Sequence, residues 1–183
     1  NRIYDSNGSG NYVETVSDYQ YDTPLFRHHM QTKTIQTNSD GTQYATRTVY
    51  PPEYTATPAN DVPSVAIKNL QDNYMIGSPV EIVQTIKKTA QSELVTGGQL
   101  IRYKNFGGAK IFPNEVWKVG TTSPISSFTY SSISGGNFSQ ASQYYQVQVL
   151  GAYDANGSLL EWNKTDDQVS SFIYWNNSLA PVA

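Results

Sequence analysis

The chain has two histidines, His28 and His29, and they are neighbours in the sequence. Imidazole is the side chain that most readily acts as a general base or a metal ligand near neutral pH. In an extended strand, neighbouring side chains point to opposite faces, so these two residues cannot bind one metal ion or share one catalytic role. We interpret the pair as structural or surface residues.

Two short stretches, residues 4–9 and 153–158, share the pattern Tyr-Asp-x-Asn-Gly-Ser. An Asp-x-Asn pattern places oxygen atoms at alternate positions, as calcium-binding loops do. The later acidic ligand that completes an EF-hand loop is absent after Asp5 and after Asp154. A turn in which Asp and Asn bond their own backbone, while Gly takes a positive φ, explains the pattern without a metal. We therefore expect no metal ion and no other cofactor.

Signatures of nucleophilic catalysis are missing from the sequence. The chain contains no cysteine, which excludes cysteine nucleophiles and thiolate metal sites. Serines are abundant, but no Gly-x-Ser-x-Gly elbow occurs. The pairs Gly97-Gly98 and Gly107-Gly108 lack the lysine of a phosphate-binding loop, and we interpret them as bulges and turns. We expect that the chain is not an enzyme.

The three tryptophans offer a different kind of chemistry. Trp117, Trp162 and Trp175 are candidate sugar-stacking residues, because exposed rings among asparagine and glutamine side chains suit a sugar-binding platform. The alternative interpretation is that these rings pack in the core or form cross-strand pairs. Sugar stacking would make the chain a carbohydrate-binding or adhesive module with surface glycans as partners.

The composition is typical of an exported β protein. The 183 residues suit a single domain spanning 1–183, and aromatic residues reach 13%, including 14 Tyr. Charged residues make up 15%, below the usual value of about 25%. The net charge of -3 and the scattered basic residues provide no stripe for a phosphate backbone, so we expect no nucleic-acid partner. No apolar run approaches the roughly 18 residues of a membrane-spanning helix.

Residues with a period of two recur along the chain and predict antiparallel strands. A hairpin is predicted at 28–50, where Asp40-Gly41 separates two Thr- and Tyr-rich runs and Tyr44, Thr46 and Thr48 share one face. In the strand predicted at 80–88, Val80, Ile82 and Ile86 alternate with Glu81, Thr85 and Lys87. Further strands are predicted at 94–106 with a bulge at Gly97-Gly98, at 111–119 with Pro113 at an edge or bulge, near 128–133, and in a meander over 145–153, 159–164 and 169–175.

One segment has helical spacing instead. Ala66, Ile67, Leu70 and Tyr74 lie on one face of a 3.6-residue period, and Asp61 is a suitable N-cap. We therefore predict an all-β fold of antiparallel hairpins or a meander, in an open twisted sheet or a sandwich, with one short helix near 62–75. The alternating apolar residues on both faces of 169–175 predict a strand covered on two sides.

Two segments carry a family resemblance. Residues 153–162 (YDANGSLLEW) and 172–183 (FIYWNNSLAPVA) resemble the tyrosine-aspartate (YD) repeat segment of Rhs-family proteins, most closely the large secreted members of Bacteroidetes type. Upstream, residues 34–41 (TIQTNSDG), 49–54 (VYPPEY) and 73–81 (NYMIGSPVE) resemble the region that precedes those repeats. The resemblance covers residues 28–183.

Rhs-type proteins build long β-sheets into a shell, so the resemblance implies that this chain is part of the wall. It implies a fragment of a larger secreted or cell-surface bacterial protein, and a non-catalytic structural scaffold. The expected partner is then the remainder of its own polypeptide or a neighbouring β-domain.

Overall fold

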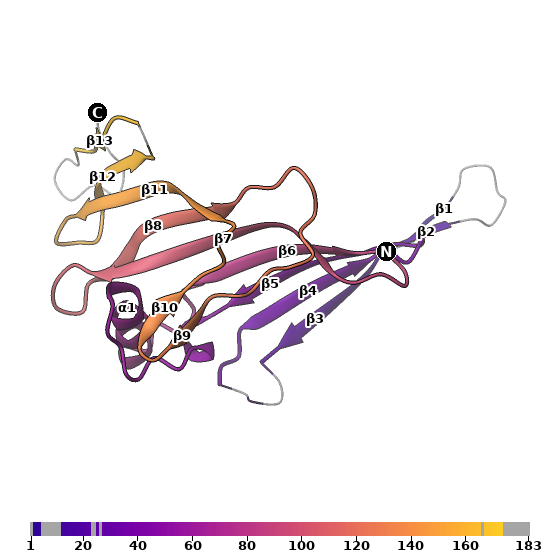
Figure 1. Ribbon diagram of the computed structural model, residues 1–183, viewed down its shortest axis with the longest axis horizontal. Coiled ribbons are helices and arrows are strands. Elements are labelled where there is room, and N and C mark those ends of the chain that lie inside the picture. The colour runs from indigo at the N-terminus through magenta and orange to yellow at the C-terminus, as the bar shows by residue number, and fades with distance from the viewer. Residues whose placement is uncertain (1, 5–11, 23–24, 26, 166, 174–183) are drawn as a thin grey trace.

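The computed structural model describes residues 2–4, 12–22, 25, 27–165 and 167–173. Its main element is an open, nine-stranded antiparallel sheet with the strand order β13-β12-β11-β8-β7-β6-β5-β4-β3 (Figure 1). Each strand of this sheet pairs with the strand that follows it in the chain, apart from the step from β8 to β11, where β9 and β10 form a hairpin of their own. The predicted all-β antiparallel meander is confirmed, and the sheet is open.

The strands of the main sheet are β3 (Val16–Tyr21), β4 (Gln31–Thr37), β5 (Gln43–Val49), β6 (Glu81–Lys87), β7 (Leu94–Asn105), β8 (Ile111–Val119), β11 (Tyr144–Tyr153), β12 (Leu159–Lys164) and β13 (Ser170–Ser171). Two small hairpins accompany it, β1 (Arg2–Tyr4) with β2 (Tyr12–Glu14), and β9 (Ser132–Ser134) with β10 (Asn137–Ser139). The helical elements are η1 (Pro51–Glu53), a short 3-10 helix, and α1 (Val62–Asp72).

Local sequence signals explain the turn between β4 and β5. Gly41 adopts a φ of 78°, a conformation in which a side chain with a Cβ is strained. The backbone N–H of Gly41 donates to the carbonyl of Asn38 at 2.9 Å, and the N–H of Asn38 donates to Thr42 O at 2.9 Å. The hairpin predicted from Asp40-Gly41 is therefore confirmed, with Tyr44, Thr46 and Thr48 on one face of β5 as expected.

The predicted helix is also confirmed, but it ends at Asp72, and Tyr74, expected on its apolar face, lies beyond it and is 88% exposed. Asp61 caps α1, because its side chain accepts a hydrogen bond from the Ser64 backbone N–H at 2.9 Å. Pro63 occupies the first turn, where a missing N–H costs nothing. Ala66, Ile67 and Leu70 are buried and pack α1 against one face of the sheet over β7.

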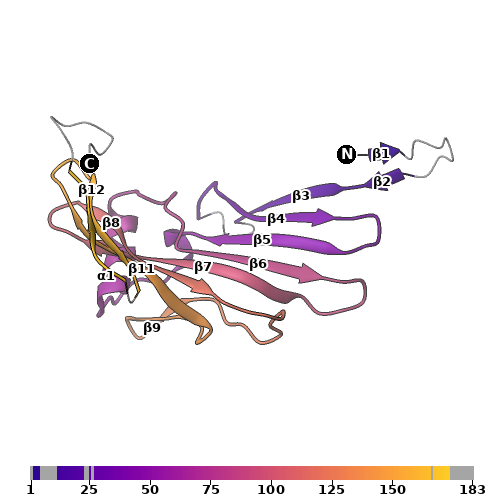
Figure 2. The ribbon, with the colours of Figure 1, turned by 90° about the horizontal axis from the view of Figure 1, so that it is seen from above.

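The face under α1 is called the covered face, and the opposite one the open face. The helix α1 and the β9–β10 hairpin lie on the same side of the twisted sheet (Figure 2). The core cluster between these layers contains Val49, Tyr54, Ala56, Ala66, Ile67, Leu70, Val80, Leu100, Tyr103, Ile111, Val119, Ala141 and Tyr144. Within the described part of the chain, neither β3 nor β4 contributes a residue to this cluster.

The strand β6 has the opposite orientation from the one that its apolar residues suggest. Glu81, Val83 and Thr85 are buried on the covered face, whereas Ile82 and Ile86 lie on the open face and are half-buried. The strand lies at the predicted residues, but the face expected to be polar and exposed is the one that points into the core. This orientation places a carboxylate in the core.

Two other strand predictions are wrong in detail, and the bulges expected at Pro113 and at Gly97-Gly98 are confirmed. Pro113 lies at a bulge in β8, which pairs with both β7 and β11 and is therefore not an edge strand. The strand expected near 128–133 begins at Ser132 instead. The expectation that 169–175 is covered on two sides is wrong for its described part, since Val169, Ser170, Ser171 and Ile173 are exposed there. The bulge expected at Gly97-Gly98 is confirmed, because the β6–β7 register shifts beside Gly97.

Candidate functional site

Polar side chains from separate segments converge on the covered face beside β5, where they line a pocket of about 270 Å³. Arg47 comes from the sheet. One wall of the pocket is formed by η1 and the residues after it, and the other wall by the segment before and within β9. We call this site the Arg47 pocket. Its lining residues are Arg27, Arg47, Val49, Glu53, Tyr54, Thr55, Tyr130, Ser131, Ser132 and Ile133.

Arg47 is the central cation of the pocket. Its guanidinium lies over the Tyr130 ring, 4.8 Å from the ring centroid, in a cation–π arrangement. Its Nη2 is 3.5 Å from Glu53 Oε2, and its Nε is buried without a hydrogen-bond partner. The side chain is still 43% exposed, so the guanidinium is held in place and remains accessible from the pocket.

Glu53 links Arg47 to a second arginine. Its Oε2 lies 3.9 Å from Arg27 Nη2, and its Oε1 accepts a hydrogen bond from the Tyr50 backbone N–H at 2.9 Å. Arg27 is itself bound to Asp22, through Nη2 at 2.8 Å and Nε at 3.0 Å. These hydrogen bonds from Arg27 lower the pKa of Asp22 to about 2. Asp22, Arg27, Glu53 and Arg47 thus form a chain of alternating charge.

The two histidines lie in different environments, as the sequence predicts. His28 is buried, whereas His29 is exposed. The Nδ1 of His28 accepts a hydrogen bond from the Met30 backbone N–H at 3.2 Å, and its Nε2 is 3.7 Å from Glu53 Oε1. The ring packs edge-on against Tyr50 with 5.2 Å between the centroids. His28 therefore supports the wall that carries Glu53.

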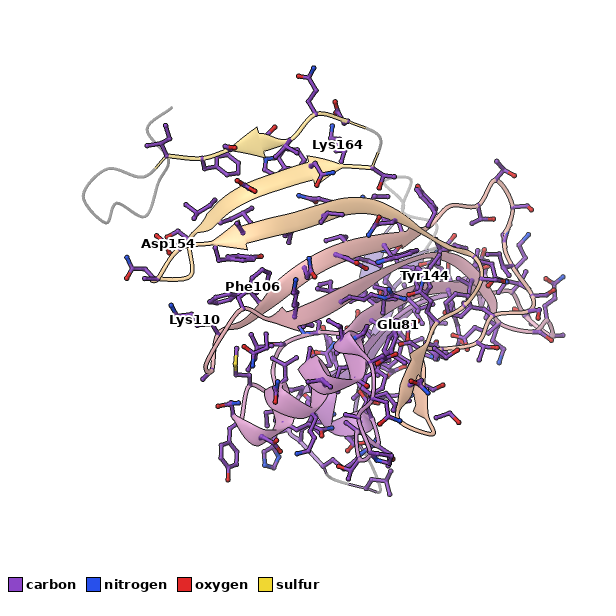
Figure 3. All side chains as sticks on the ribbon, turned by 60° about the vertical axis from the view of Figure 1, so that its left-hand side comes forward. Glu81, Phe106, Lys110, Tyr144, Asp154 and Lys164 are labelled. Atoms are coloured by element: carbon purple, nitrogen blue, oxygen red, sulfur yellow. The ribbon has the colours of Figure 1, made fainter. Side chains whose placement is uncertain are left out.

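Below the pocket lies a fully buried carboxylate. Glu81 is 0% exposed, and its Oε2 accepts hydrogen bonds from the N–H and the hydroxyl of Ser131 at 2.9 Å and 2.7 Å. Its Oε1 accepts a hydrogen bond from the Tyr144 hydroxyl at 2.9 Å. The labelled Glu81 and Tyr144 lie near each other in Figure 3, although β7 and β8 separate their strands in the sheet. Burial raises the pKa of Glu81 above its usual value.

Tyr54 completes this buried network, since its hydroxyl is 2.7 Å from Ser131 Oγ. Burial raises the pKa of Tyr54 and of Tyr144 far above the usual tyrosine value, so both stay protonated and act as donors. The network joins η1, β6, the segment before β9 and β11. Because Glu81 is enclosed, its carboxylate cannot exchange protons with a bound molecule, and its role here is to hold the four segments together.

No protein-family model, curated protein or solved structure matches the chain.

The two described candidate tryptophans, Trp117 and Trp162, lie on β8 and β12, which β11 separates in the sheet. The Nε1 of Trp117 donates to Glu115 Oε2 at 2.8 Å, and the Arg102 guanidinium lies 4.7 Å from the Trp117 ring centroid. Trp162 is half-buried and pairs with Leu150 across β12 and β11. Trp175 lies outside the described residues. A sugar-stacking role for these rings stays a prediction.

The stretch at 153–158 forms a turn. Asp154 Oδ1 accepts hydrogen bonds from the backbone N–H groups of Asn156 and Ser158, each at 2.8 Å, and Gly157 has a φ of 88°. These backbone hydrogen bonds, above all the one from Ser158, lower the pKa of Asp154. Residues 5–9 of the matching stretch lie outside the described part.

Among the described residues, no group of three or more His, Cys, Asp and Glu side chains could hold a metal ion, and no helix is long and apolar enough to cross a membrane.

Sequence reasoning did not find the Arg47 pocket. Arg47 lies in a strand that the Thr and Tyr alternation predicts, and the alternation of Val80, Ile82 and Ile86 places Glu81 on the polar face of its strand. One signal was present for Glu81, because it is in phase with Val83, an apolar residue that the chosen alternation left unassigned. Ser131 and Tyr130 belong to a Ser- and Gly-rich segment with no distinctive spacing.

Proposed function

We propose that the chain is a non-catalytic structural segment of a β-sheet scaffold in a larger, secreted or cell-surface bacterial protein of Rhs/YD type. The observation that carries this proposal is the uncovered edge strand β3. The scaffold continues at this edge, where the remainder of the same polypeptide or a neighbouring β-domain supplies the next strand.

The strand β3 is exposed on both faces along its whole length. Among the described residues its one partner in the main sheet is β4, so within that part of the chain no strand pairs with the backbone N–H and C=O groups of its other edge. Its sequence, VSDYQY, contains no proline or lysine, the residues that most often protect such an edge from pairing. Tyr19, which is 58% exposed, adds a large apolar surface. These features suit a strand that another strand covers.

The core distribution supports the same proposal. The core cluster ends at Val49 in β5, which leaves β3 and β4 as a two-stranded extension of the sheet. Two strands without a packed face are marginally stable in water. A neighbouring strand or sheet would stabilise them by completing the backbone hydrogen bonds and covering Val16, Tyr19 and Tyr21.

The buried polar residues fit a structural role as well. The Glu81 network binds four separate segments to one another, and its hydroxyl groups are used in internal hydrogen bonds. Such a network specifies how the covering layer is aligned on the sheet.

Amide hydrogen exchange tests the scaffold proposal. We expect the β3 amides that point away from β4 to exchange rapidly in the isolated 183-residue chain and to be protected in the intact gene product, where the next strand covers the edge. The central strand β7 serves as an internal control, because it is paired on both sides and should be protected in both samples. Equal, rapid exchange of β3 in both samples would contradict the proposal.

A further inference from the structure

Arg47 carries hydrogen-bond donors that the described residues leave largely unused. A guanidinium has five N–H donors. Among the described residues, Arg47 donates to the carboxylate of Glu53 at a long distance of 3.5 Å. Its Nε has no hydrogen-bond partner. Glu53 is also held by the Tyr50 backbone N–H at 2.9 Å. An incoming anion can therefore bind the accessible terminal N–H groups of Arg47, although not the buried Nε, without leaving Glu53 unpaired.

Two other arginines have their guanidinium groups occupied more fully. Arg27 binds Asp22 through Nε and Nη2 at 3.0 Å and 2.8 Å. Arg102 donates to Glu115 Oε2 through Nη1 at 3.3 Å and lies over two rings, 4.7 Å from the centroid of Trp117 and 5.7 Å from that of Phe138. Its Nε, like that of Arg47, is buried without a partner among the described residues, but its side chain is only 25% exposed. Arg47 is stacked on one ring and is 43% exposed. It is thus oriented by Tyr130 but still open on its pocket side.

The surroundings of Arg47 favour a sugar acid. A planar guanidinium pairs with a carboxylate through two parallel hydrogen bonds. The exposed hydroxyl groups of Thr55 and Ser132 line the same pocket and can bind sugar hydroxyls. The volume of about 270 Å³ is just below the range of about 300 to 1,000 Å³ that accepts drug-sized ligands, so the pocket suits a single ring.

We infer that the Arg47 pocket binds a hexuronate, a sugar ring with one carboxylate, as found along acidic polysaccharides. Arg47 binds the carboxylate, the Tyr130 ring contacts the sugar, and Ser132 and Thr55 bind its hydroxyl groups. The pocket lies on the covered face and not at the free edge of β3, so this inference goes beyond the scaffold role and stands independently of it.

Titration of the ¹⁵N-labelled chain with methyl glucuronide tests this inference, with the Arg47 Nε–H and Ser132 N–H signals as reporters. We expect saturable shifts of both signals, and no comparable shifts with methyl glucoside, which lacks the carboxylate. Arg47→Gln should weaken binding by about tenfold or more, because charge-assisted hydrogen bonds are lost. Arg102→Gln is the matched control, and it should leave the affinity unchanged.

Ser132→Asp provides a second variant whose folding is not at risk, since Ser132 is exposed. It places a negative charge at the pocket and should abolish binding of the uronide. Binding of methyl glucuronide that survives both Arg47→Gln and Ser132→Asp, or an absence of binding to the unmodified chain, would overturn the inference. Acetate that binds as tightly as the uronide would overturn the assignment of a sugar.

Discussion

Replacing Glu81 separates the hydrogen-bonding role of its carboxylate from its charge. Glu81→Leu removes the acceptor for three donors, the N–H and hydroxyl of Ser131 and the hydroxyl of Tyr144. The Ser131 and Tyr54 hydroxyls keep the one hydrogen bond between them, so three buried donors are left without a partner. Each such donor costs about 1 to 3 kcal/mol. The apolar isostere recovers part of this cost, because a buried carboxylate no longer has to be desolvated.

We therefore expect Glu81→Leu to lower the free energy of unfolding by about 2 to 4 kcal/mol, a large part of the 5 to 15 kcal/mol that is typical of a domain. Glu81→Gln should cost less than Glu81→Leu, about 1 to 3 kcal/mol, because Ser131 keeps its acceptor while the Tyr144 hydroxyl proton loses its own. Its amide oxygen can accept from Ser131, while its amide nitrogen can donate to the Tyr144 oxygen. Urea unfolding of the three proteins measures these differences.

The pH dependence of the same variants gives the sign of the charge effect. Burial raises the pKa of Glu81 above its usual value of 4.5. As the pH rises above this value, the unfolded chain releases the proton first, so the native protein loses stability until the pH passes the raised pKa. Glu81→Gln lacks this loss. The stability of the unmodified chain relative to Glu81→Gln should therefore decrease as the pH rises above about 4.5, the usual pKa of the group.

Two results would refute this reasoning. An unfolding free energy that Glu81→Leu leaves unchanged would mean that the carboxylate does not hold the four segments together. The second result is a stability that rises with pH in the unmodified chain relative to Glu81→Gln. It would mean that the folded protein lowers the pKa of Glu81, because the hydrogen bonds to the carboxylate stabilise its charge more than burial destabilises it.

Asp22→Asn should remove an acid-sensitive contribution, because the pKa of Asp22 falls from 3.8 to about 2 on folding and its stabilisation is lost as the pH falls through that range. The unmodified chain should then lose more stability on acidification than Asp22→Asn does, as unfolding midpoints would record, and parallel losses would contradict this. Gly157→Val should destabilise by more than about 1 kcal/mol, because the φ is 88° and a Cβ would lie 2.9 Å from Phe112 Cζ. Gly107→Val is the control in thermal unfolding, since its φ is also positive but no atom lies within 4 Å of its Cβ; equal costs would mean that the Phe112 contact is unimportant.

Predictions that depend on a few neighbouring residues agree with the structure. Asp61 and Pro63 define the start of α1, because a capping side chain and a proline act on the N–H groups of the first turn alone. Gly41 and Gly157 define two hairpin turns through their positive φ. These preferences act within about four residues and need no knowledge of the rest of the fold.

The orientation of β6 could not be predicted in this way. A period of two separates the side chains of a strand into two faces, but it does not say which face is covered. Ile82 and Ile86 suggested an inward face, and yet Glu81 and Val83 are the buried residues. The segments that pack over the sheet decide which face of β6 is buried, because they bring the hydrogen-bond donors that make burial of Glu81 possible.

The sequence by itself predicted the antiparallel strands β4 to β8, β11 and β12, the hairpin turns and the helix α1, since each follows from local backbone preferences, but it predicted neither β3 nor the order of the strands. Only the tertiary structure decided that Arg47, Glu53 and Ser131 share one pocket and that Glu81 lies beneath it. These residues are up to 84 positions apart, counting from Arg47 to Ser131. Their meeting depends on how the segment before β9 folds back over β5 and β6, and packing between distant segments leaves no local pattern in the chain.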